Sequence, residues 1–231
     1  MSEEKMVGFF VSVEGGEATG KTTLQQGLYR RLEEEGWGDY LPSEEQISRL
    51  HEPGGTRLAE RLRELLLTKE FEIDEVEAVL MFNAARSSLM RSLIIPLLRE
   101  GKIVILDRFV DSTLAYQCGK GTLSFDDVER VNQFGARRLY PDLTLLIDLP
   151  VEVALARRQM NPWDRYESRD LAYHRKVREN FHRIAQNNPQ RIVMLDGQRP
   201  VGQMVEEAYL ALLPRLRVHF QMDKASRAKG G

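Results

Sequence analysis

One short stretch of the chain, SVEGGEATGKTTL at residues 12–24, has the residue types and spacing of a phosphate-binding loop. The pattern G-x-x-x-x-G-K-[ST] is matched by Gly15, Gly20, Lys21 and Thr22. In such a loop the glycines let backbone N–H groups surround an anion, the lysine reaches the terminal phosphates, and the hydroxyl ligates Mg²⁺. An apolar stretch precedes this loop and a helical pattern follows it, as the motif requires. The sequence therefore predicts a nucleoside triphosphate site.

The whole loop is expected to contribute to this site, through Gly15, Gly16, Glu17, Ala18, Thr19, Gly20, Lys21, Thr22 and Thr23. Glu17 is unexpected among them, because a carboxylate repels phosphate and so needs another partner. The loop contains no arginine, although phosphoryl transfer depends on positive charge around the moving group. Further cations must therefore come from other segments.

Arg108 is the first candidate, since it follows the apolar stretch IVIL and ends a buried strand expected to lie next to the loop. Its neighbour Asp107 either holds the Mg²⁺ water shell or caps the helix that follows. Both interpretations of Asp107 stay open, whereas a charged pair at the ligand-binding edge of a sheet marks Arg108 as a site candidate.

A second group of arginines, Arg157, Arg158 and Arg165, lies in ALARRQMNPWDRYESRD, a proline-containing segment between two predicted helices. A mobile segment rich in arginine suits a lid that closes over phosphates. The alternative is an ordinary solvated surface, in which the arginines pair with Asp164, Glu167 and Asp170.

These side chains require strands and helices that bring them to one edge of a sheet. Buried strands are predicted at 8–14, 102–108, 142–150 and 191–197, with a short strand in RLHEPGGT. Helices are predicted at 21–36, 57–67, 74–99, 110–118, 125–139, 151–159, 168–187 and 201–217. Apolar strands that alternate with helices predict an α/β fold, with a mostly parallel sheet covered on both faces and a ligand at the carboxyl ends of the strands. Residues 1–220 are expected to form one domain, and the polar segment 221–231 a disordered tail.

Composition limits the classes of partner. Lys and Arg (33) nearly balance Asp and Glu (35), so no overall basic field favours nucleic acid. No apolar run approaches the roughly 20 residues of a membrane helix. The single Cys118 excludes an internal disulfide and is expected to be a packing residue. Without a signal-like N-terminus, this favours a reducing cytoplasm. A GTPase switch is disfavoured, because neither D-x-x-G nor N/T-K-x-D occurs.

Five segments together resemble the bacterial thymidylate kinase family, whose members phosphorylate dTMP with ATP. They are EGGEATGKTT (14–23), EPGGTRLAERLR (52–63), LMFNAAR (80–86), DRFVDSTLAYQ (107–117) and DRYES (164–168). The resemblance implies the nucleoside monophosphate kinase fold with a small arginine-rich lid at about 157–168, the substrates ATP and dTMP, Mg²⁺, and a homodimer. It also implies that Glu17 faces the acceptor nucleotide near its sugar 3′-hydroxyl.

The resemblance assigns the remaining acceptor residues by position. An aromatic at Phe82 stacks on thymine and Arg86 hydrogen-bonds the base; from the sequence alone, Phe82 would be interpreted as a core residue. Arg108 grips the dTMP phosphate, and Tyr116 crowds the 2′ position of the sugar. Thr113 and Gln117 match polar positions near the base. Arg63 matches an arginine that lines the acceptor site, but it equally suits a charge on a helix surface.

With Ala18 in the loop, the chain resembles the branch of the family that supplies arginine from the lid. Two features depart from the family pattern. His51 stands where an arginine usually precedes Glu-Pro-Gly-Gly, and the stretch 37–47 is longer than expected. Two other functions stay open: a kinase for a different nucleoside monophosphate, and a nucleotide-dependent switch or binding module without phosphotransfer.

Overall fold

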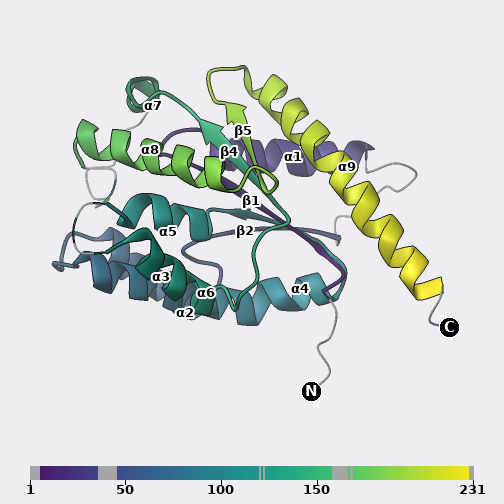
Figure 1. Ribbon diagram of the computed structural model, residues 1–231, viewed down its shortest axis with the longest axis horizontal. Helices are drawn as coiled ribbons and strands as arrows, with labels where there is room; N and C mark the ends of the chain where they lie inside the picture. The colour runs from purple at the N-terminus through teal and green to yellow at the C-terminus, as the bar shows by residue number, and fades with distance from the viewer. Residues whose placement is uncertain are drawn as a thin grey trace.

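The computed structural model describes residues 6–35, 46–119, 121, 123–157, 166 and 169–228 (Figure 1). Five strands form a sheet in the order β2-β3-β1-β4-β5, and every neighbouring pair is parallel. The strands are β1 (Phe9–Gly15), β2 (Ile47–His51), β3 (Ile103–Asp107), β4 (Leu143–Asp148) and β5 (Ile192–Asp196). The predicted parallel sheet is confirmed, with strand boundaries mostly within two residues of those predicted.

The helices are α1 (Lys21–Glu35), α2 (Arg57–Leu67), α3 (Glu75–Leu89), α4 (Ile95–Arg99), α5 (Val110–Gln117), α6 (Phe125–Gly135), α7 (Val151–Arg157), α8 (Leu171–Asn187) and α9 (Val201–Ala228). They cover both faces of the sheet, as Figure 1 shows. Side chains along β1 alternate between these faces. Val11 and Val13 pack in one cluster with residues of α1 and α9, whereas Phe10 packs in another with residues of α4 and α5.

The predicted helix 74–99 is interrupted by one π-helical turn, η2 (Met90–Ile94). Pro96 accounts for it, because proline lacks an N–H and its ring clashes with the carbonyl four residues earlier in a regular α-helix. The backbone widens instead, and the N–H of Ile95 bonds to the carbonyl of Met90.

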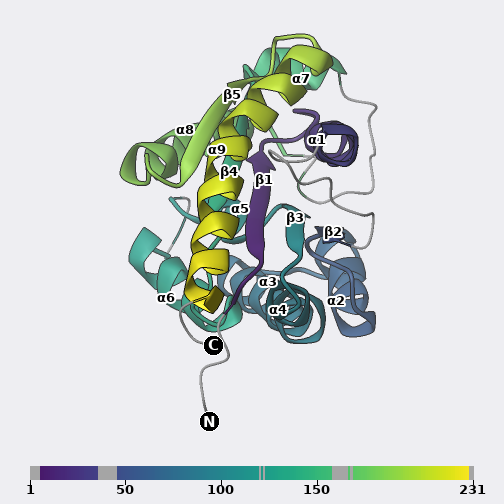
Figure 2. The same cartoon turned by 90° about the vertical axis from the view of Figure 1, so that its right-hand side faces the viewer.

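Two predicted helix ends were wrong. Helix α6 stops at Gly135 rather than 139, because Arg137 and Arg138 adopt positive φ angles of 52° and 59°. Helix α9 continues past 217 to Ala228 and so includes much of the segment predicted to be disordered. His219 holds this extension on the sheet through its ring contact with Phe9 (5.3 Å between centroids) and a hydrogen bond to the carbonyl of Val7. Figure 2 shows α9 running alongside β1.

The helical run Glu75–Arg99 is long and apolar enough to cross a membrane by length and composition alone. Half of its most apolar window is buried inside the protein, where α3 packs against α2 and α6. A core helix has the same properties, so this run is weak evidence for a membrane span.

Candidate active site

The predicted phosphate loop connects β1 to α1, at the carboxyl edge of the sheet. Gly15 and Gly20 have φ angles of 147° and 95°, and a Cβ at Gly15 would lie only 2.8 Å from the carbonyl oxygen of Ile147. The Lys21 ammonium group folds back over the loop and donates to the carbonyl of Gly16 at 2.6 Å. The loop thus has the strand–turn–helix geometry that the motif requires.

Lys21 lies in a crowded electrostatic environment. Burial and the nearby Arg108 both lower its pKa, and they outweigh the opposing effect of Glu17 and Asp107, so the pKa falls to about 8. An anion bound in the loop would stabilise the protonated form and raise this value.

Thr22 and Asp107 form the predicted metal site. The Thr22 hydroxyl donates to Asp107 Oδ2 at 2.9 Å, and Asp107 Oδ1 is buried without a hydrogen-bond partner. Hydroxyl and carboxylate oxygens suit Mg²⁺, which usually keeps several water or phosphate ligands. Within the described ranges, no cluster of three or more His, Cys, Asp or Glu residues could hold a metal alone. A metal ion at this position would therefore need further ligands from bound nucleotide or water.

Glu17 turns toward α5. Its Oε1 accepts hydrogen bonds from Arg108 Nη2 at 2.9 Å and from the Tyr116 hydroxyl at 2.8 Å. Burial acts to raise the pKa of Glu17, but Arg108, Lys21 and the Tyr116 hydrogen bond outweigh it and lower the pKa to about 2. The unexpected carboxylate is therefore charged and paired with a cation outside the loop.

Arg108 joins the phosphate loop to α5. Its Nη1 donates to the Gly15 carbonyl at 3.0 Å and to the Ser112 hydroxyl at 3.2 Å, and its guanidinium lies 5.1 Å from the centre of the Tyr116 ring. Its backbone has a φ of 67°, which is uncommon for a residue other than glycine. Burial acts against its charge, but Glu17, Tyr116, Asp107 and Glu14 together outweigh it, and the pKa of Arg108 rises above its usual value.

The predicted acceptor residues line one cavity of about 170 Å³. They are Glu17, Arg63, Phe82, Arg86, Arg108, Thr113, Tyr116 and Gln117. Phe82 is only partly buried, which contradicts its interpretation as a core aromatic. Its role in stacking on a base stays a prediction.

A second, more open hollow of about 690 Å³ follows the phosphate loop and contains Lys21, Thr22 and Asp107. Glu17, Glu52, Arg63 and Arg108 line both hollows. The two hollows therefore share a boundary that carries two arginines, with room for a phosphate on either side. Arg63 donates to the Pro53 carbonyl at 2.8 Å, which holds it at this boundary rather than on an outer helix surface.

Arg86 is held by a network that the sequence did not reveal. Its Nε donates to Glu52 at 2.9 Å, its Nη1 to Asn132 at 2.9 Å and Asn83 at 3.1 Å, and its Nη2 to Thr113 at 2.8 Å. Burial raises the pKa of Glu52 to about 7, although Arg86 acts to lower it. Glu52 begins the motif EPGGTRLAERLR, but nothing in its spacing along the sequence indicated a contact with Arg86.

Tyr166 also lies at this cavity and was missed by sequence reasoning. Its ring is 5.9 Å from that of Phe82 and 6.1 Å from that of Tyr116, measured between centroids, and its hydroxyl accepts from Gln117 at 3.3 Å. The motif DRYES contained the signal, because an aromatic residue next to the lid arginines can close over a base.

The lid prediction is only partly covered by the described residues. Arg157 ends α7, lines the phosphate hollow and donates to the Gly197 carbonyl at 2.9 Å. Arg158, Arg165 and most of the stretch 37–47 lie outside the described ranges. His51 lines the phosphate hollow too, with its Nε2 3.5 Å from Glu60 Oε1.

Comparisons with known proteins agree on one family. The thymidylate kinase family model matches residues 13–208. The chain is 39% identical to a thymidylate kinase of Caldanaerobacter subterraneus subsp. tengcongensis over 85% of this chain and 90% of that protein. It is 40% identical to a thymidylate kinase of Pseudomonas fluorescens over 91% of this chain and 97% of that protein. The crystal structure of an Ehrlichia chaffeensis thymidylate kinase superposes with a TM-score of 0.69, at 30% identity, over 87% of this chain and 98% of that one.

Proposed function

The chain belongs to the thymidylate kinase family, and on that premise we propose that it transfers the γ-phosphoryl group of ATP to dTMP, forming dTDP for dTTP synthesis. The observation that carries this proposal is the shared boundary between the two hollows, where Arg63 and Arg108 face both sides. A donor on the phosphate loop and an acceptor in the smaller cavity would present their phosphates to this boundary.

The donor site is proposed for ATP with Mg²⁺. The loop N–H groups and Lys21 would hold the phosphates, while Thr22 and Asp107 would hold the metal. Bound there, Mg²⁺ supplies charge neutralisation to the transferring group. Lys21, Arg108 and the lid arginines Arg157, Arg158 and Arg165 would neutralise the charge that develops on the moving phosphoryl group. No side chain need act as a strong base, because the acceptor phosphate is already anionic.

The acceptor cavity is proposed for a thymine deoxynucleotide. Arg86 makes four hydrogen bonds within the protein, so its guanidinium is held rigidly, and its remaining N–H on Nη2 is the donor we propose for the base. Phe82 would stack on thymine, with Tyr166 closing the pocket. Tyr116 is held by its bond to Glu17 beside the sugar position, where it leaves little room for a 2′-hydroxyl. Glu17 would accept the hydrogen bond of the 3′-hydroxyl.

A coupled assay of purified protein with ATP and Mg²⁺ across nucleoside monophosphates tests this proposal. We expect the largest kcat/KM for dTMP. Equal or greater turnover of UMP or CMP would assign the chain to a different nucleotide. ATP binding without turnover of any acceptor would favour a binding module.

We also propose a homodimer that buries an exposed apolar surface on α2, α3 and their connection. Leu58 and Leu65 on α2, Val76 and Leu80 on α3, and Phe71 between them are each at least 40% exposed. Exposed apolar patches of this kind mark interaction sites, and a second copy of the chain is the partner we propose.

The cytoplasm is the proposed location, because a reducing compartment keeps a single cysteine as a thiol. Cys118 is buried, and burial raises its pKa to about 12, which makes it unreactive. The balanced charge gives no reason to expect nucleic acid as a partner.

A further inference from the structure

Glu14, the residue before the phosphate loop, has a role that its sequence position does not suggest. Alternation along β1 places it on the same face as Phe10, toward α5. Its side chain is fully buried. A buried carboxylate is costly unless its oxygens are hydrogen-bonded, so its partners indicate what it does.

Both oxygens of Glu14 bind the first turn of α5. Oε1 accepts the backbone N–H of Phe109 at 2.7 Å, and Oε2 accepts the Ser112 hydroxyl at 2.6 Å. Helix α5 has no side-chain cap from its own N-cap residue, Phe109. Glu14 therefore satisfies from β1 the N–H of the N-cap residue and ties the first turn of the helix to the sheet through Ser112.

Both bonds go to residues that closely follow Arg108 in the chain. Its own N–H donates to Val13 at 3.0 Å, and the next N–H along the chain donates to Glu14. Its guanidinium donates to Ser112, whose hydroxyl is oriented by Glu14. Glu14 thus fixes the N–H that follows the left-handed backbone of Arg108 and one of the contacts of its side chain, beside the bonds that the guanidinium makes to Gly15 and Glu17.

We propose that Glu14 is a positioning residue, which aligns Arg108 with the phosphate loop by tying the end of β1 to the start of α5. Glu14 itself touches neither nucleotide. Because Glu14 directly precedes the loop, the same bonds set the distance between the donor loop and the acceptor arginine. The inference rests on the proposed function, in which Arg108 binds the acceptor phosphate.

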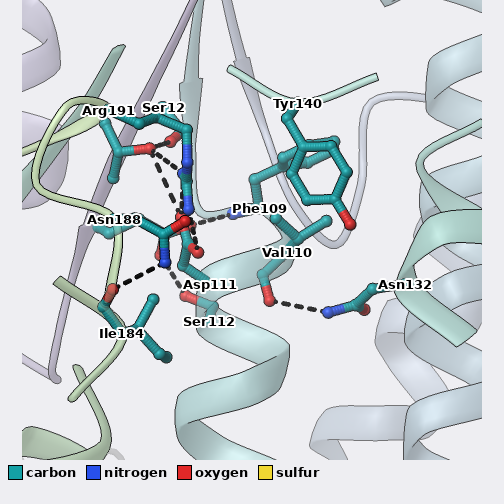
Figure 3. A network of polar contacts seen from close by, with 12 residues as sticks. Ser12, Phe109, Val110, Asp111, Ser112, Asn132, Tyr140, Ile184, Asn188 and Arg191 are labelled. Atoms are coloured by element: carbon teal, nitrogen blue, oxygen red, sulfur yellow. Dashed lines mark hydrogen bonds and ion pairs between the residues drawn. The ribbon is translucent and has the colours of Figure 1, made fainter. Parts of the chain in front are cut away.

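Asp111, a carboxylate in the first turn of α5, provides a matched control for Glu14. Both oxygens of Asp111 bind Arg191, at 2.6 and 2.8 Å, and Arg191 also donates to Thr144 on β4. Figure 3 shows this clamp on the first turn of α5. Asp111 contacts Arg191 and Thr144 and not Arg108. Asp111→Asn therefore weakens the anchoring of α5 without removing a contact of Arg108.

The test compares Glu14→Ala, Glu14→Gln and Asp111→Asn with the parent protein, measuring kcat, both KM values and the melting temperature. Glu14→Ala is expected to raise the dTMP KM about tenfold, the typical effect of losing a hydrogen bond to a charged group, and to leave the ATP KM within about twofold. Glu14→Gln keeps an oxygen for Phe109 and is expected to lie between Glu14→Ala and the parent. Asp111→Asn, which leaves both Glu14 bonds in place, is expected to lower the melting temperature and to change the dTMP KM less than Glu14→Ala does.

A dTMP KM that stays at the parent value in both Glu14 variants would overturn the proposal, as would equal changes in the two KM values. If the parent protein itself fails to turn over dTMP, the proposed function fails. The role of Glu14 is then tested by the crystal structure of a variant. A crystal structure of the free Glu14→Gln or Glu14→Ala variant is expected to show Arg108 displaced from the Gly15 carbonyl. An unmoved Arg108 would refute its positioning by Glu14, whatever the acceptor is.

Discussion

At the level of single residues, Glu17 lies between the acceptor cavity and the phosphate hollow and separates them. Its carboxylate is paired with Arg108 and hydrogen-bonded by Tyr116, and with a pKa of about 2 it stays charged throughout the neutral range. Its negative charge repels phosphate, while its oxygens can accept a hydrogen bond from a sugar hydroxyl. One residue can therefore hold an arginine in place and separate donor from acceptor.

Glu17→Gln is expected to raise the dTMP KM by about tenfold or more, because charge-assisted hydrogen bonds contribute about 1.5–3 kcal/mol. Steady-state kinetics with dTMP as the varied substrate measure this. Tyr116→Phe removes one hydrogen bond to the same carboxylate and serves as the milder comparison, with an expected rise of a few fold. An unchanged dTMP KM in Glu17→Gln would show that the carboxylate does not face the acceptor.

Two other carboxyls make stability depend on pH. Burial and the charge of Asp111 raise the pKa of Glu14 to about 7, and burial raises that of Glu52 to about 7, from an ordinary value of 4.5. The folded protein therefore binds these protons more tightly than the unfolded chain between about pH 4.5 and 7. The free energy of unfolding must fall as pH rises through this window, by at most about 1.4 kcal/mol per pH unit for each carboxyl.

Urea denaturation of the parent protein and Glu52→Gln from pH 4.5 to 8 checks this contribution. The variant is expected to show a shallower decline, because glutamine does not titrate. The informative quantity is the slope of the free energy of unfolding against pH, because loss of the bond to Arg86 also changes the absolute free energy of unfolding. Parallel curves for the two proteins would contradict the raised pKa of Glu52.

The residues found by sequence reasoning belong to short sequence motifs, as Lys21, Thr22 and Arg108 do. Glu52 and Asn132 escaped it, because they meet Arg86 across 34 and 46 positions of the chain. Glu14 escaped it for the same reason, being 95 positions from Phe109. Such contacts arise only when separate elements pack, and no local spacing encodes them.

At the level of elements, α5 connects most parts of the site. It begins at Val110, two positions after Arg108, and carries Thr113, Tyr116 and Gln117 along eight residues. Asn132 of α6 bonds both to Arg86 and to the Val110 carbonyl in the first turn of α5, a bond also visible in Figure 3. A shift of α5 would therefore move the groups assigned to the base, the sugar and the phosphate together.

The lid after α7 gives a prediction at this scale. Arg165→Ala is expected to lower kcat by about 10³-fold, the typical effect of removing a cation that stabilises phosphoryl transfer. The dTMP KM is expected to change far less, because Arg108, the residue assigned to the dTMP phosphate, is left in place. Rapid-quench or coupled kinetics separate the two quantities. A near-normal kcat would return Arg165 to the solvated-surface interpretation.

Element boundaries could be predicted where composition changes sharply. Strands β1, β3, β4 and β5 are short, mainly apolar runs that end in aspartate or glycine, and their ends were found closely. The π-helical turn at Met90–Ile94 was not predicted, because apolar periodicity continues across it while Pro96 changes the backbone. The extension of α9 was not predicted either, because it depends on His219 and Phe220 finding partners on the sheet.

For the whole molecule, parallel strands bring the chemistry to one edge. Asp107 and Asp148 end β3 and β4, Glu14 is the last residue but one of β1 between them, and the phosphate loop starts from β1 at the centre of the sheet. The order β2-β3-β1-β4-β5 places β3, which leads to Arg108, directly beside β1. The donor loop and the acceptor arginine are therefore neighbours because of the strand order, although 93 residues separate Gly15 from Arg108.

The proposed homodimer gives the prediction that concerns the molecule as a whole. Leu58 and Leu80 are both 55% exposed, on helices α2 and α3 that pack together. Each leucine removed from water contributes about 1.5–3 kcal/mol, and a symmetric interface counts each one twice. The double variant Leu58→Lys and Leu80→Lys is therefore expected to convert a dimer into a monomer.

Sedimentation velocity at several protein concentrations measures this change. Leu210→Lys is the matched control, because Leu210 is 57% exposed on α9, on the opposite side of the sheet from α3, and its replacement is expected to leave the dimer intact. A double variant that remains dimeric would move the interface to another surface. A parent protein that sediments as a monomer at every concentration would leave α2 and α3 without a second copy and refute the homodimer.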